Sequence, residues 1–123
     1  MKIKKSNAEL EQKLEQIKEL IKQKIELPSK TSYAIIKNKI AIERALEPFV
    51  LSRDEIIKNK AGGKTSVSAK DDPKAFNEIC EAINEIALEL SEVEISTIKL
   101  SDIAEREMPL SAIDALSFMI EEG

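Results

Sequence analysis

The stretch that most clearly predicts a fold class is DPKAFNEICEAINEIALELS, residues 72–91. Asp72 can cap a helix whose first residue is Pro73, because proline lacks the backbone N–H that has no helical acceptor at that position. The stretch therefore predicts an amphipathic helix over 72–91. Its apolar residues recur every three or four positions, at Phe76, Ile79, Cys80, Ile83, Ile86, Ala87 and Leu90.

A second helix is predicted upstream, over residues 6–26. Ser6 and Glu9 have the spacing of a capping box, in which each side chain bonds the backbone N–H of the other. Pro28 ends the helix, because a residue that precedes proline is disfavoured in the α conformation. The apolar residues form a narrow seam at Leu10, Leu14, Ile17 and Ile21.

This seam allows two interpretations. A narrow seam between charged flanks is typical of a short coiled coil, so we expect an intermolecular interface and a homo-oligomer, most simply a dimer. The alternative is that the same seam packs on the following helix of its own chain as a helical hairpin.

A third helical stretch is predicted over residues 29–60, ending before Gly62 and Gly63. Pro48 lies inside it. Because proline removes a hydrogen bond and clashes with the preceding turn, we expect this helix to be kinked or split there.

The C-terminal third is predicted to contain a strand at 93–100 and a short helix at 111–121. The strand alternates apolar and polar residues, and its candidate partners are residues 2–5 and 65–68. The sequence therefore predicts one domain, residues 1–123. Its fold class is mostly α: a helical hairpin or bundle with a kinked second helix and a small β element near the C-terminus.

Composition excludes several classes of function. The chain of 123 residues has no His, one Cys and a net charge of −4. Without His, the usual general base and imidazole metal ligand are missing, so we expect no enzyme activity, metal or cofactor. Mild acidity argues against direct binding of duplex DNA. No apolar run approaches the roughly 20 residues that span a bilayer, so we expect no membrane partner.

Residues 29–60 also present two faces with possible binding roles. Asn38 lies in the middle of the apolar face, where a buried amide needs a partner: either a structural polar contact or a bound ligand. The opposite stripe carries Lys30, Tyr33, Lys37, Ile40 and Arg44. There an aromatic ring and cations can hold an anionic, planar molecule such as a nucleotide. The alternative is a solvated basic face. The predicted ligand set is Tyr33, Lys37, Asn38 and Arg53.

Residues 27–122 also resemble a group of small proteins from phages and prophages of Gram-positive bacteria. The resemblance implies a phage source and action in the cytoplasm of an infected cell, without a particular mechanism. The segments that carry it are Leu27-Pro28, residues 32–38 (SYAIIKN), Arg53, residues 72–78 (DPKAFNE), residues 93–95 (VEI), residues 98–102 (IKLSD) and residues 116–122 (LSFMIEE).

With this setting, the sequence predicts a non-catalytic binding protein that counters a bacterial defence system. The first hypothesis is sequestration of a nucleotide immune signal. The alternatives are an inhibitor that docks on a CRISPR or other defence effector nuclease, and an accessory protein of virion assembly. Loss of an anti-defence protein should impair infection only in defended hosts, whereas loss of an assembly protein should impair it in every host.

Overall fold

In the computed structural model, residues 1–62, 70, 72–103 and 108–120 are described, and they are mostly helical. This confirms the predicted α class. The helices are α1 (Asn7–Lys22), α2 (Ser29–Lys60), α3 (Pro73–Ala87) and α4 (Leu110–Leu116). The strands are β1 (Lys2–Ser6) and β2 (Leu90–Glu94), and short 3-10 turns lie at Leu100–Asp102 and Ser117–Met119.

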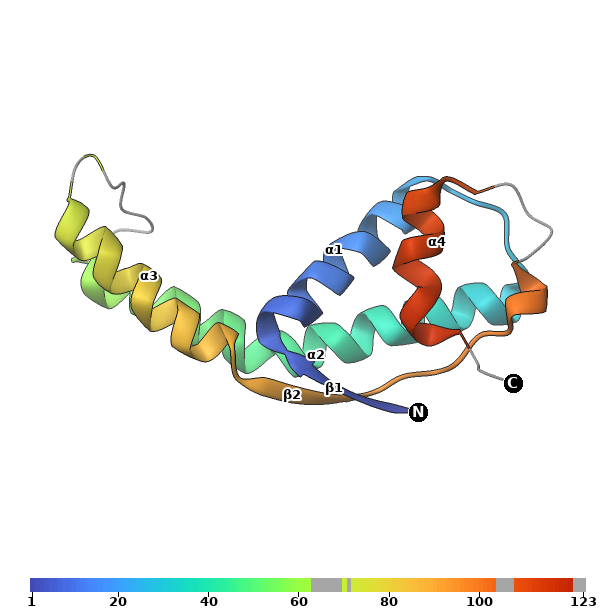
Figure 1. The fold of residues 1–123 in the computed structure, drawn as a ribbon, viewed down its shortest axis with the longest axis horizontal. Helices are drawn as coiled ribbons and strands as arrows, with labels where there is room; N and C mark the ends of the chain where they lie inside the picture. The colour runs from blue at the N-terminus through green and yellow to red at the C-terminus, as the bar shows by residue number, and fades with distance from the viewer. Residues whose placement is uncertain (63–69, 71, 104–107, 121–123) are drawn as a thin grey trace.

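The helices form a packed body and a projecting arm (Figure 1). In the body, α1 packs against α2 and α4. In the arm, α3 runs back along the C-terminal half of α2 toward the body, where its C-terminal end meets the start of α1. We use "the arm" for α3 together with residues 52–60 of α2.

The start of α1 confirms Ser6 as its N-cap, while the Glu9 carboxylate contacts the Ser6 hydroxyl. The Glu9 backbone N–H donates to Ser6 Oγ at 3.2 Å, and the Ser6 hydroxyl donates to Glu9 Oε1 at 3.4 Å. The helix ends at Lys22, four residues earlier than predicted. Lys24 has a φ of 51°, in the left-handed region, so the chain leaves the helix before it reaches Pro28.

α2 runs through Pro48 as one helix of 32 residues, so the predicted split is wrong, while the kink stays a prediction. Pro48 is exposed on α2. Proline has no N–H to bond the carbonyl of Arg44, four residues earlier, and water can bond that carbonyl instead. Buried Leu46 and Phe49, on either side, hold the helix to the rest of the protein. Gly62, with φ 65°, follows the end of α2.

The small sheet differs from the prediction in position. β2 pairs antiparallel with β1, with Lys2 opposite Glu94 and Ser6 opposite Leu90. Residues 2–5 are thus the correct partner, whereas residues 65–68 lie outside the described part of the chain. The strand also starts earlier than predicted, at Leu90 rather than at residue 93. The predicted C-terminal β element over 93–100 reduces to the end of β2 and an isolated bridge between Ile98 and Ile120.

The helices predicted around β2 are also shorter than expected. The helix predicted over 72–91 stops at Ala87, because the following residues enter β2. The helix predicted over 111–121 is α4 followed by the 3-10 turn Ser117–Met119, and residue 121 lies outside the described residues.

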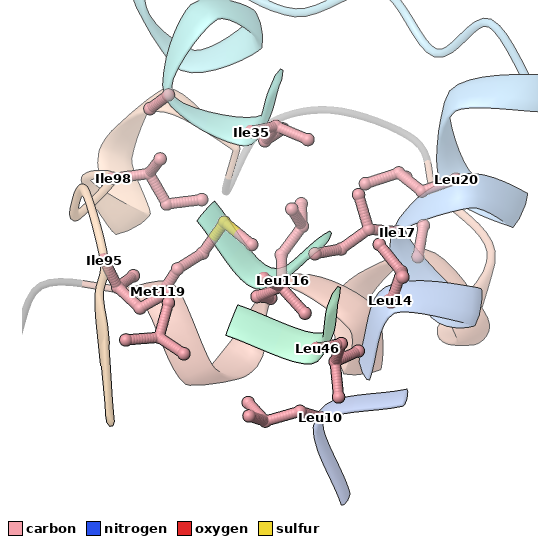
Figure 2. Close-up of a cluster of buried hydrophobic side chains, with 14 of the residues drawn as sticks. Leu10, Leu14, Ile17, Leu20, Ile35, Leu46, Ile95, Ile98, Leu116 and Met119 are labelled. Carbon is pink, nitrogen blue, oxygen red and sulfur yellow. The ribbon is translucent and has the colours of Figure 1, made fainter. Parts of the chain in front are cut away.

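The hydrophobic core lies between α1, residues 34–49 of α2, α4 and the extended segment after β2 (Figure 2). Four side chains that meet there are at most 2% exposed: Leu10, Ile17, Leu46 and Leu116. Burying one such side chain contributes roughly 1.5–3 kcal/mol. α3 contributes one buried residue, Ile79, so the arm is less deeply packed than the body.

Candidate functional site

Asn38 is fully buried, and its amide is bound to the chain itself. Its Nδ2 donates to the Ser96 carbonyl at 2.9 Å, and its Oδ1 accepts from the Ser96 backbone N–H at 2.7 Å. Nδ2 also lies 3.3 Å from Met119 Sδ. The structural interpretation of Asn38 is therefore confirmed, with an extended segment rather than a helix as its partner. The prediction that Asn38 contacts a ligand is wrong, because its side chain is buried in the core and bonded to Ser96.

Tyr33 and Lys37 are the two predicted ligand residues that the structure brings together. They lie one turn apart on the solvent side of α2, and Lys37 Nζ is 5.4 Å from the centre of the Tyr33 ring. Tyr33 is 65% exposed. The ammonium group occupies one face of the ring in a cation–π contact, so only the other face is open to a stacking partner.

Arg53 lies elsewhere. Its Nη1 donates to Glu11 Oε2 at 2.8 Å, and its guanidinium carbon is 5.1 Å from the centre of the Phe49 ring. Sixteen residues of helix separate Arg53 from Lys37, which corresponds to about 24 Å at 1.5 Å per residue. The predicted four-residue set is therefore not one site: Tyr33 and Lys37 are together, Asn38 is internal, and Arg53 joins α2 to α1.

The seam predicted as an interface is mostly internal. Leu10, Leu14 and Ile17 are buried in the core, against α2 and α4. Only Ile21 is exposed, at 42%. The hairpin alternative for α1 is therefore correct, and a homo-oligomer cannot use this seam without unfolding the body.

An apolar face that the sequence reasoning missed lies on α2 instead. Tyr33, Ile36, Ile40 and Leu51 are exposed at 65, 49, 42 and 59% of their surface. We call them, with the charged residues between them, the outer face of α2. At 3.6 residues per turn they lie opposite buried Ile42. The signal was present in the sequence as Ile36, Ile40 and Leu51, but the neighbouring lysines made the stripe look like a basic face.

A groove of about 560 Å³ runs beside this face, between α1 and α2. Its apolar residues include Ile40, Val50 and Leu51. Its charged residues have both signs and come from both helices: Glu11, Glu15, Lys18, Glu43, Arg44, Glu47 and Arg53. An open groove with an apolar floor and mixed charges is suited to another helix rather than to a small anion.

The stretch from the start of α3 to the end of β2 is strongly acidic. Residues 72–94 contain seven carboxylates and one lysine, a net charge of −6 in a chain whose total is −4. On α3, exposed Glu78, Glu81 and Glu85 follow one helical face. Glu78 Oε2 is 3.9 Å from Lys60 Nζ, whereas Glu81 and Glu85 make no ion pair within the described residues. The arm therefore presents an acidic face to solvent.

The described residues contain no group of three His, Cys, Asp or Glu side chains arranged to hold a metal ion. Within the same residues, no helix has both the length and the apolarity needed to cross a bilayer. Cys80 is half-buried on α3.

Comparison with known proteins identifies no relative: no family model, no curated protein and no solved structure matches the chain.

Proposed function

We propose that this chain is a non-catalytic protein that docks on the basic surface of a bacterial defence nuclease and inhibits it. The observation that carries the proposal is the acidic face of α3, where Glu78, Glu81 and Glu85 are exposed, within a stretch, residues 72–94, whose net charge is −6. A nuclease must present lysine and arginine side chains to the phosphates of its substrate. An acidic helix attracts such a surface and repels nucleic acid itself.

The packing of the arm supports the same proposal. α3 has a broad apolar face, but only Ile79 is buried; Phe76, Cys80 and Ile83 are half-buried, and the helix packs mainly against α2. A partner that covers the edges of this face would bury more apolar surface, at about 25 cal/mol per Å². Charge would then direct the encounter, and apolar contact would hold the complex.

The setting comes from the resemblance of residues 27–122 to phage proteins of Gram-positive bacteria, which supports action in the cytoplasm of an infected cell. Sequestration of a nucleotide signal has weaker support, because Asn38 is bound to Ser96 and Arg53 to Glu11. Deleting the gene distinguishes a role in virion assembly from inhibition of a nuclease. Loss of an assembly protein would reduce infection in every host, whereas loss of an inhibitor would do so only in defended hosts.

The test is inhibition of purified defence nucleases, including a CRISPR effector nuclease, by the purified chain in a DNA-cleavage assay. We expect the wild-type chain to inhibit one of them. Glu81→Lys combined with Glu85→Lys should weaken inhibition at least about tenfold, because attraction becomes repulsion. Inhibition should also fall as salt is raised above about 0.1 M, where the screening length is about 10 Å.

The matched control is Glu15→Lys combined with Glu19→Lys, which reverses the same number of charges on exposed positions of α1. This control should inhibit as well as the wild type. Equal inhibition by the arm variant, or no inhibition of any nuclease in the panel, would contradict the proposal.

A further inference from the structure

The charges on the outer face of α2 are divided along the helix. Toward the N-terminal end of α2, on and beside this face, lie exposed Lys30 and Lys37; toward the C-terminal end of the face lie exposed Glu47, Asp54 and Glu55, with Lys58 beyond them. Arg44 lies between them. A second α2 helix in the antiparallel direction would therefore bring lysines beside carboxylates, whereas a parallel one would bring lysine beside lysine.

The apolar residues of this face have the same symmetry. Tyr33 and Leu51 are each nine residues from Ile42, and Lys37 and Glu47 are each five residues from it. A two-fold axis at the level of Ile42 would thus bring Tyr33 of one copy level with Leu51 of the other. It would also bring Lys37 level with Glu47. Self-complementarity of this kind is what a two-fold interface requires, since each contact occurs twice.

From this we infer that a second copy of this chain docks on the outer face of α2, giving an antiparallel two-fold dimer. The interface buries Ile36 and Ile40 near its centre and leaves the core of each copy unchanged. It replaces the predicted dimer through α1, whose seam is internal. It also lies apart from α3, so it does not depend on the nuclease-docking proposal, and its failure would leave that proposal standing.

The first test is the mass in solution, measured by sedimentation equilibrium from about 1 to about 200 µM, the range where micromolar association is visible. The wild type should approach twice the 13.7 kDa of one chain. Ile40→Glu should remain a monomer, because it places two carboxylates in an apolar contact. Circular dichroism should show that this variant keeps its helices, since Ile40 is 42% exposed in the single chain.

The matched control is Leu88→Glu, which changes an apolar side chain that is 73% exposed between α3 and β2. It should dimerise like the wild type. A wild type that stays at 13.7 kDa throughout would overturn the inference. So would a dimer that Ile40→Glu does not weaken, because its interface would then lie elsewhere.

The second test fixes the direction of the helices by exchanging charges. Lys37→Glu alone and Glu47→Lys alone should each weaken self-association about tenfold, because two pairs of opposite charge become pairs of like charge. An equimolar mixture of the two variants should form heterodimers, in which glutamates again face lysines. Heterodimers no tighter than the two homodimers would overturn the antiparallel arrangement.

Discussion

The inner and outer faces of α2 have similar apolar residues and opposite roles. The inner face buries Ile35, Ile42 and Leu46 in the core, while the outer face exposes Ile36, Ile40 and Leu51 to water. The polar residues differ more: Asn38 is bound to the backbone of Ser96, whereas Lys37 rests over Tyr33. The comparison teaches that a residue on this helix stabilises the fold or remains free for binding according to whether the rest of the chain covers it, and not according to its polarity.

The largest effect should come from the inner polar contact. Asn38→Leu leaves the Ser96 N–H and carbonyl without their partner, at about 1–3 kcal/mol for each buried group. We expect the free energy of unfolding to fall by roughly 2–5 kcal/mol in a urea titration. Ser96→Ala is the matched control and should change it by less than about 0.5 kcal/mol, since the contact uses the Ser96 backbone. Equal losses in the two variants would show that Asn38 does not act through that backbone.

A smaller effect of opposite sign is expected at Pro48, which is exposed within α2. Pro48→Ala restores an N–H for the Arg44 carbonyl and removes a clash, each unfavourable in a helix interior. The protein should become more stable by roughly 1–3 kcal/mol, measured by urea unfolding at a concentration where it is monomeric. A loss of stability would mean that a bend at Pro48 is needed to place the arm against the body.

The smallest effect on stability is expected on the outer face. Ile40→Gln removes an exposed apolar side chain without touching the core. The monomer's free energy of unfolding should change by less than about 0.5 kcal/mol in dilute solution. A loss of 2 kcal/mol or more, as roughly expected for a core residue, would erase the distinction between the two faces.

Local signals in the sequence predicted most of the helices. Capping at Ser6 and Asp72 is seen as expected, since a cap depends on residues three positions apart. The sheet was less predictable, because its partner strands β1 and β2 are more than 80 residues apart and β1 is mostly lysine. Only tertiary packing selects that pairing.

The binding residues were harder to predict than the fold. A helical wheel places Asn38 on the apolar face, but it cannot show that Ser96 supplies both hydrogen bonds. The seam of α1 looked like a coiled coil because the wheel shows which residues share a face and not which chain covers them. Arg53 is grouped with Lys37 in the predicted set because both lie on or near one predicted helix, although its partner is Glu11 on another helix.

Disulfide cross-linking across the outer face of α2 tests the account most directly. In a chain carrying Cys80→Ser, we would make Tyr33→Cys and Leu51→Cys separately. The new cysteines lie about 27 Å apart along one helix, so two copies of the same variant cannot cross-link in the antiparallel dimer. On mild oxidation, the account predicts a covalent dimer from the equimolar mixture and none from either variant alone. Cross-linking within one variant as efficient as in the mixture, or no cross-link in any sample, would contradict it.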